Sequence, residues 1–370
     1  MASLSKDILF EILLRLPIKT IVRMKCVNRS WRTLIQDPLF VESHLERTKQ
    51  VKSPSILVAS SKNSKDESLL IYPWENPCQS IEVFPHLRPH NGKLDIIGTC
   101  DGIVLVRDTI NIWEQEVAMF LWNPSINDLF RIPTPKNRPL RILGFGQKKE
   151  NVRSEYKVVS ITKKDYETVD VEIYNLQKNT WITKRDVFPT NVILTYTDKK
   201  RLVLANGSSH CVVWHRPSGS LVVLSFNWAD EVFQITEFPS DFHYELISTH
   251  FELHGHLAFA LIKVSELEIW VMEKFGGVGS LRKAYSFALL LLPTAATATH
   301  ELIPVPIGLT ESGFILFNGC NGTWFWYDPN SNEVKLFGDD QLGEPGYHAY
   351  TFFESLVPVS SSLHGEVSLS

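Results

Sequence analysis

A hairpin pattern recurs along residues 70–340 and limits the chain to a few possible folds. In each copy an apolar strand ends in an aromatic residue, a polar turn follows, and a second strand begins near another bulky side chain. The aromatic anchors lie 44 to 57 residues apart, at Tyr72, Trp122, Tyr174, Phe226, Trp270 and Tyr327. A period of about 50 residues is typical of propellers built from four-stranded blades. The pattern therefore predicts an all-β propeller of about six blades.

Turn residues support this interpretation. The Asn123-Pro124 pair reverses the chain because proline fixes φ. Glycines ahead of four anchors indicate innermost strands entered through tight turns: Gly102, Gly207, Gly255 and Gly313. The spacing is the kelch-like value, and a twisted β-sandwich, which lacks a regular period, is the second choice.

The first 50 residues predict helices instead of strands. Ser5 is a suitable N-cap ahead of apolar residues at helical spacing, and Pro17 ends this first helix. After a second short helix, Asn28 is able to cap a third, and Asp37-Pro38 is a favoured opening for a fourth. So small a unit has a marginal core, and its apolar residues exceed what one inner face can bury. Some of them are therefore expected to contact a partner.

Charge changes where this helical segment ends. Residues 1–50 contain nine Lys/Arg and five acidic residues, a net charge of +4, whereas the whole chain carries -4. We therefore expect a helical unit at residues 1–50 and a β domain at residues 51–355. The polar, serine-containing end of the chain predicts a flexible tail at residues 356–370.

A small basic helical module suits two functions. It could read DNA with its third helix in the major groove, but the segment lacks a glycine turn and Trp31 occupies a core-spaced position. It could instead bind a helical adaptor protein through exposed apolar residues. A helical cap on the β domain, with no partner, is the third possibility.

Residues 4–45 resemble an F-box. Four elements carry the resemblance in order: Glu-Ile-Leu-x-Arg-Leu-Pro at 11–17, the basic Lys-Cys-Val at 25–27, Ser-Trp-Arg-x-Leu-Ile at 30–35 and Asp-Pro-x-Phe at 37–40. The resemblance implies docking to the Skp-type adaptor of cullin ubiquitin ligases through Leu4, Ile8, Ile12, Leu13, Leu16, Pro17, Ile21, Met24, Val27 and Trp31. The family usually begins with Leu-Pro, whereas Ser5 follows Leu4 here, so a weaker first contact is expected.

The β domain is similar to the F-box-associated domain of plant F-box proteins. The similarity rests on Trp181 and on short segments at residues 99–105, 121–125, 143–146, 156–159, 172–176, 205–207 and 268–272. It implies that this domain recognises a substrate protein, and it suggests a plant source.

No motif of an enzyme active site is present in the sequence: no Gly-x-Ser-x-Gly elbow, P-loop, dinucleotide fingerprint or zinc-protease helix. The five cysteines lie far apart without a Cys-x-x-Cys pair, which argues against a disulfide framework and a cysteine zinc site. We therefore expect no catalytic residues, no metal and no cofactor.

The same features bear on localisation. The N-terminus does not resemble a signal peptide, and the longest apolar run, residues 287–292, is too short to span a bilayer. A pI of about 6.3 argues against non-specific binding to nucleic acid or membrane. A cytoplasmic or nuclear protein is expected.

The sequence thus predicts the substrate-recognition subunit of an SCF-type cullin ubiquitin ligase, which promotes ubiquitination and degradation of a target protein. Two alternatives stay open: a DNA-binding regulator that uses the basic helices, and a propeller ligand-binding protein with an incidental helical cap. Trp113, Trp228 or Trp324 could anchor the target, but each fits blade packing equally well.

Overall fold

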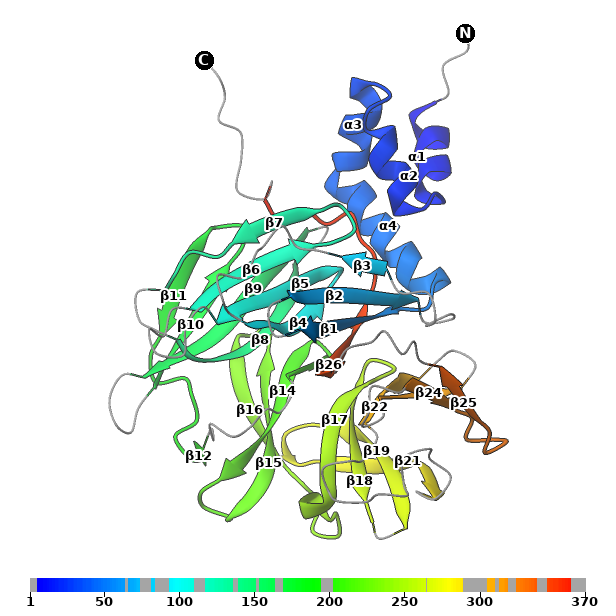
Figure 1. Ribbon diagram of the computed structural model, residues 1–370. Coiled ribbons are helices and arrows are strands. Elements are labelled where there is room, and N and C mark those ends of the chain that lie inside the picture. Colours follow the sequence, from blue (N-terminus) through cyan, green and yellow to red (C-terminus); the bar gives the residue numbers. More distant parts are fainter. Residues whose placement is uncertain are drawn as a thin grey trace.

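The computed structural model shows a small helical unit standing on a ring of β-sheets (Figure 1). It describes residues 5–63, 66–73, 81–83, 93–109, 117–135, 139–150, 153–163, 169–193, 202–263, 265–288, 305–309, 313–318, 324–337 and 345–360.

Four helices form the helical unit: α1 (Lys6–Leu14), α2 (Ile18–Met24), α3 (Arg29–Gln36) and α4 (Pro38–Val51). Three of them begin at the expected caps, because the side chains of Ser5, Asn28 and Asp37 each accept a backbone N–H of the first turn. Their shared core contains Leu13, Ile21 and Phe40, all buried.

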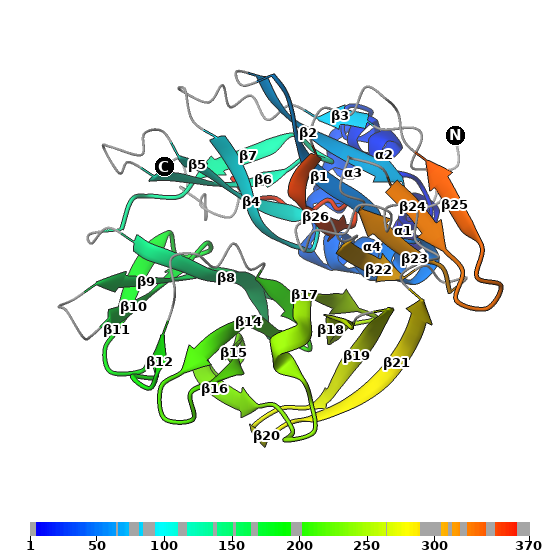
Figure 2. The same ribbon diagram turned by 60° about the horizontal axis from the view of Figure 1, so that its bottom comes forward.

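Six sheets, the blades, surround one axis (Figure 2), and all their strand pairs are antiparallel except β16 with β20. From the innermost strand outward, blade 1 contains β26 (Pro345–Phe352), β1 (Ser55–Asn63), β2 (Asp66–Pro73) and β3 (Ile81–Val83). Blade 2 contains β4 (Lys93–Cys100), β5 (Ile103–Thr109), β6 (Val117–Asn123) and β7 (Asp128–Arg131). Blade 3 contains β8 (Pro139–Glu150), β9 (Arg153–Lys163), β10 (Val169–Asn175) and β11 (Thr180–Lys184).

The other three blades follow the same plan. Blade 4 contains β12 (Val192–Ile193) and β13 (Val203–Ala205), both paired with β14 (Ser208–His215), then β15 (Ser220–Asn227), β16 (Val232–Glu237) and β20 (Gly277–Val278). After a 3₁₀ turn (Tyr244–Leu246), blade 5 contains β17 (Ile247–Leu253), β18 (His256–Ile262), β19 (Glu266–Lys274) and β21 (Ser280–Ala288). Blade 6 contains β22 (Val305–Leu309), β23 (Ile315–Asn318), β24 (Trp324–Tyr327) and β25 (Val334–Phe337).

The two ends of the β domain meet in blade 1 and close the ring. Strand β26 runs antiparallel to β1, with Ser55 opposite Phe352. The side chains of Tyr350 and Phe352 are buried in the core that blade 1 shares with blade 2. The last described strand is therefore the innermost strand of the first blade.

The expected fold, a small helical unit followed by a six-bladed propeller, is confirmed, and the sandwich alternative is wrong. Each aromatic anchor lies on the third strand of its blade. Tyr174 on β10, for example, lies opposite Trp181 on β11. One expectation is corrected: the four glycine turns lead from the innermost strand to the second strand, because Gly102 joins β4 to β5 and Gly255 joins β17 to β18.

Glycine allows blades 3 and 4 to approach closely. The indole of Trp228, which is buried, lies against Gly144 and Gly146 of β8, and a Cβ atom at Gly146 would overlap it. The Trp228 Nε1 donates a hydrogen bond to Ser209 Oγ at 3.2 Å. Both glycines are thus required by packing.

A buried histidine in blade 4 makes the stability of the protein depend on pH. His210 is buried between Ser225 Oγ (2.7 Å) and the Ala205 carbonyl (3.0 Å), and burial lowers its pKa to about 4. Since the unfolded histidine takes up its proton near pH 6.5, acidification favours the unfolded chain. We expect His210 to cost about 2 kcal/mol of folding free energy between pH 7 and pH 5. Urea unfolding of the wild type and His210→Gln at both pH values measures this, and equal losses in the two proteins would contradict it.

The end of the described chain differs from the expectation. Residues 353–360 follow β26 and lie between the helices and blade 2, with Leu356, Val357 and Val359 buried. The prediction of a flexible tail from residue 356 is therefore wrong for residues 356–360, because three apolar side chains here enter two cores. Residues 361–370 lie outside the described residues.

Candidate functional site

The helical unit exposes apolar side chains on the side that faces away from its own core. Ile8 and Ile12, one turn apart on α1, are 51% and 45% exposed. Val27, which follows α2, is 56% exposed. Apolar side chains at such exposure on a small unit are typical of a docking surface for another protein.

The other expected docking residues divide into three groups. Pro17 is exposed, and Leu16, Met24 and Trp31 are half-buried against the core. Leu13 and Ile21 are only 1% and 0% exposed, so these two side chains form the core of the helical unit and do not reach a partner. The apolar spacing alone could not separate the two faces of such short helices. Leu4 lies outside the described residues.

Two exposed apolar residues of α4 lie outside the expected docking set. Leu39, at the start of the helix, is 56% exposed, and Val51, at its end, is 64% exposed. In the sequence, Leu39 fits the same apolar face as Phe40 and Leu45, so the pattern alone does not separate it from these buried residues.

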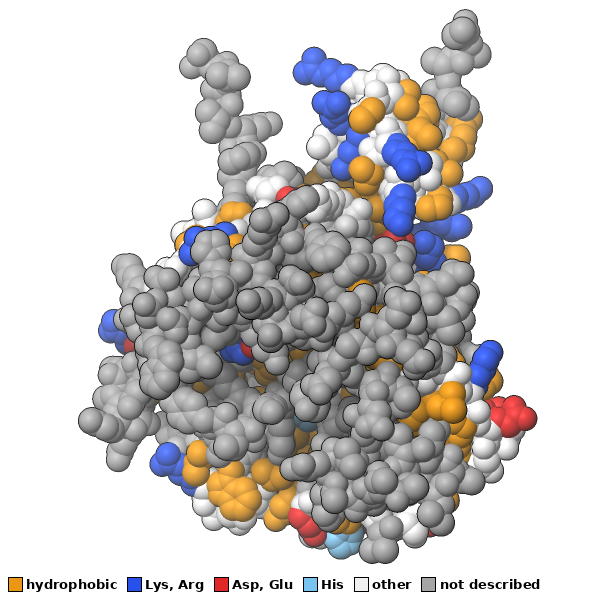
Figure 3. Space-filling view, viewed as in Figure 1, with side chains coloured by type: hydrophobic (Ala, Val, Ile, Leu, Met, Phe, Trp, Pro, Cys, Tyr) orange, Lys and Arg blue, Asp and Glu red, His pale blue; other side chains and the backbone are white. Residues whose placement is uncertain are grey.

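Basic side chains surround this apolar surface. Lys19, Arg23, Arg29 and Arg32 are all exposed on α2 and α3. Figure 3 shows Lys and Arg side chains interspersed with hydrophobic ones over the helices. A partner that docks here is therefore expected to present apolar side chains bordered by acidic ones.

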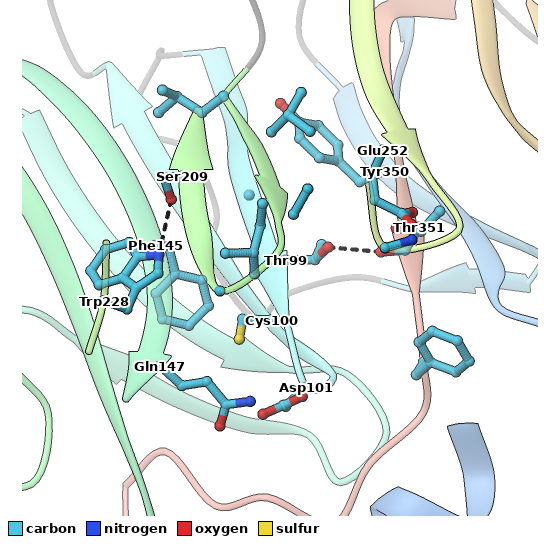
Figure 4. A pocket seen from close by; sticks show the side chains of 18 of the residues that line it. Thr99, Cys100, Asp101, Phe145, Gln147, Ser209, Trp228, Glu252, Tyr350 and Thr351 are labelled. Carbon is cyan, nitrogen blue, oxygen red and sulfur yellow. Dashed lines mark hydrogen bonds between the residues drawn. The ribbon is translucent and has the colours of Figure 1, made fainter. Parts of the chain in front are cut away.

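A second feature is a cavity of about 330 Å³ among the inner strands, at the end of the propeller near α4 (Figure 4). Lys49 of α4, the β4–β5 turn, β8, the β13–β14 turn and residues 350–353 contribute to its wall. Most of its polar side chains already have structural partners: Thr99 Oγ1 donates to the Thr351 carbonyl at 2.7 Å, and Ser209 accepts from Trp228.

Two charged groups of the cavity, Lys49 and Asp101, form an ion pair. Asp101, whose side chain is 4% exposed, accepts from Lys49 Nζ at 2.6 Å and from Tyr156 Oη at 3.1 Å. Burial and the Asp101 carboxylate raise the pKa of the Cys100 thiol well above its ordinary value. Cys100 therefore stays a protonated thiol, which is not the nucleophilic form. The Asp101–Lys49 pair instead connects α4 to the propeller.

Two of the three tryptophans that could anchor the target are buried. Trp228 and Trp324 are 1% and 3% exposed, so they pack within and between blades. Trp113 lies outside the described residues. The target-binding residues stay unassigned.

Among the described residues, no group of His, Cys, Asp or Glu side chains could hold a metal ion. In the same residues no helix is long and apolar enough to cross a bilayer.

Comparison with known proteins supports the two-part architecture. Residues 57–332 match the family model described as the F-box associated beta propeller domain, and residues 1–43 match that of the F-box domain. Both resemblances expected from the sequence are confirmed.

Relatives match over both parts. The F-box/kelch-repeat protein At3g23880 of Arabidopsis thaliana is 27% identical, over 90% of this chain and 92% of the relative. The F-box protein CPR1 of the same plant is 25% identical, over 90% of this chain and 84% of the relative. The similarity thus includes the helical unit and the propeller in the same order.

Proposed function

Because the chain belongs to the F-box-associated β-propeller family and carries an F-box at its N-terminus, we propose that it is the substrate-recognition subunit of an SCF-type cullin ubiquitin ligase. The observation that carries the proposal is the exposed apolar surface of the F-box helices, above all Ile8 and Ile12.

The F-box is proposed to bind a Skp-type adaptor and, through it, a cullin. Ile8, Ile12, Pro17 and Val27 would provide the contact area, with Leu16, Met24 and Trp31 at its buried border. Burying apolar side chains that are half exposed contributes most of the binding free energy in interfaces of this kind.

The propeller is proposed to bind the target protein on the face turned away from the helices. The opposite face is partly covered, because α4 and residues 353–360 pack on it. Adaptor and target would then bind at opposite ends of the molecule, and the ligase would act by holding target lysines at high effective concentration.

In this proposal the chain is a non-catalytic subunit, with no cofactor, which promotes degradation of its target. We place it in the cytoplasm or nucleus. No disulfide joins the described cysteines, Cys26, Cys100 and Cys211, and reduced thiols persist in reducing compartments.

Affinity capture of the full chain from plant extract with the proteasome inhibited tests the proposal. Mass spectrometry is expected to recover a Skp-type adaptor and a cullin together with further proteins whose abundance rises when the proteasome is inhibited. Recovery of neither adaptor nor cullin would overturn the proposed function.

A further inference from the structure

The segment of residues 353–360, here called the strap, packs between the propeller and the F-box. It continues directly from β26, the strand that closes the ring. The Leu356 side chain enters the core of the F-box helices, whereas Val357 and Val359 enter the core shared by blades 2 and 3. Consecutive strap residues thus belong to two different cores.

The hairpin between β6 and β7 holds the strap backbone. Buried Asn123 donates through Nδ2 to the carbonyl oxygens of Ser355 (3.1 Å) and Val357 (2.8 Å). The carboxylate of Asp128 accepts the Val359 N–H at 2.8 Å and the Ser360 N–H at 3.1 Å. Charged or buried hydrogen bonds of this kind fix a backbone that belongs to no sheet.

Close packing and glycine geometry also fit the strap to blade 2. Gly102 has φ +76°, and a Cβ atom there would overlap Ser355 and the Phe353 carbonyl. Ile126, in the same β6–β7 hairpin, packs against the F-box core. One hairpin of the propeller therefore contacts both the strap and the helices.

Helix α4 completes the junction. Val41 packs against both cores, and Leu45 is buried in the core of blades 2 and 3. Lys49 pairs with Asp101, and Lys149 of β8 pairs with Glu46 at 2.7 Å. One covalent connection, the end of α4 with residues 52–54, thus joins the F-box to the propeller, and the strap adds a second, non-covalent contact on the same F-box core.

We propose that the strap is a clamp that fixes the F-box in one orientation on the propeller, with Leu356 and Asn123 as its positioning residues. Without the strap, mainly the contacts of α4 and Ile126 would hold the F-box against motion about residues 52–54, and the packing of Leu356 restricts this motion further. The rigidity is a property of the chain alone. Its consequence for ubiquitin transfer rests on the proposed function: a fixed orientation restricts which lysines reach the transfer site.

Spin-label distance measurements test the clamp on the full chain. One nitroxide is placed on the exposed native Cys26 of the F-box and the other on Ser218→Cys of the propeller, with Cys78 and Cys320 replaced by serine. We expect one narrow distance distribution for this background. It should broaden in Leu356→Ala, which leaves the propeller side chains intact, and in Asn123→Ala, which leaves the F-box core intact.

Matched controls separate the clamp from general loosening. Asn175→Ala changes the corresponding buried asparagine of the β10–β11 hairpin, and Leu336→Ala changes an exposed leucine of β25. Both are expected to keep the narrow distribution. A broad distribution in the background protein, or a narrow one in both strap variants, would overturn the clamp.

A second measurement connects the clamp to transfer. In a ligase reconstituted with adaptor and cullin, self-ubiquitination of the chain is mapped by mass spectrometry. Asn123→Ala is expected to keep adaptor binding and to spread ubiquitin over more lysines than the wild type. If adaptor binding is absent in the wild type, the proposed function fails, while the distance measurement still decides on the clamp. An unchanged lysine pattern with normal adaptor binding would overturn the role in transfer.

Discussion

A chain that ends at residue 344 is expected to lose its cooperative unfolding transition and to aggregate. It would lack β26, which supplies the innermost strand of blade 1 and pairs with β1 from Ser55 to Ser60. Removing buried Tyr350 and Phe352 alone should cost about 3–5 kcal/mol each, against a total stability of about 5–15 kcal/mol for a typical domain. Calorimetry and gel filtration of the truncated chain measure the effect.

Two longer truncations serve as controls. A chain ending at residue 360 keeps every described residue and should melt at the wild-type temperature. A chain ending at residue 352 keeps ring closure but lacks the strap, so its propeller should still unfold cooperatively while mainly α4 and Ile126 hold the F-box in place. A normal melting transition for the chain ending at residue 344 would show that β26 is dispensable for closing the ring.

Local signals were enough to predict the elements of this fold. The caps at Ser5, Asn28 and Asp37 act within four residues of the chain, so the helix starts could be read directly. The hairpins of the propeller are also local, and each repeats an aromatic residue at the third strand. A period of about 50 residues therefore predicts the blades from the sequence alone.

Contacts between distant residues could not be predicted in this way. The strap resembles a polar tail in the sequence, although Ser355, Leu356, Val357 and Val359 are buried. Asn123 and Asp128, which hold its backbone, lie more than 200 residues earlier in the chain. The same limit applies to the F-box. Both Leu13 and Ile12 fit a helical apolar pattern, but only the packing of α4 and the strap decides that Leu13 is buried and Ile12 exposed.

Exposure also decides which substitution tests the adaptor surface best. Changing Leu16 would disturb the F-box itself, because this half-buried side chain packs against the core. The backbone carbonyl of the same residue accepts a hydrogen bond from His44 Nε2 at 3.1 Å. Neither Ile8 nor Ile12 is buried in that core, since about half of each residue's surface is open to solvent. A change at these two positions alters the docking surface and leaves the core in place.

The double variant Ile8→Glu/Ile12→Lys is expected to weaken adaptor binding more than about 100-fold, since a buried interface anchor contributes about 2 kcal/mol or more. Glutamate four residues before lysine supports a helix, so α1 should stay folded, and the net charge is unchanged. Calorimetric titration of the full-length variant with purified Skp-type adaptor measures the loss. A matched variant on the propeller, Val232→Glu/Val278→Lys, alters two residues that are 51% and 66% exposed and should bind like the wild type. Equal affinity of the F-box variant and the wild type, with α1 shown intact by circular dichroism, would place the adaptor contact elsewhere on the helical unit.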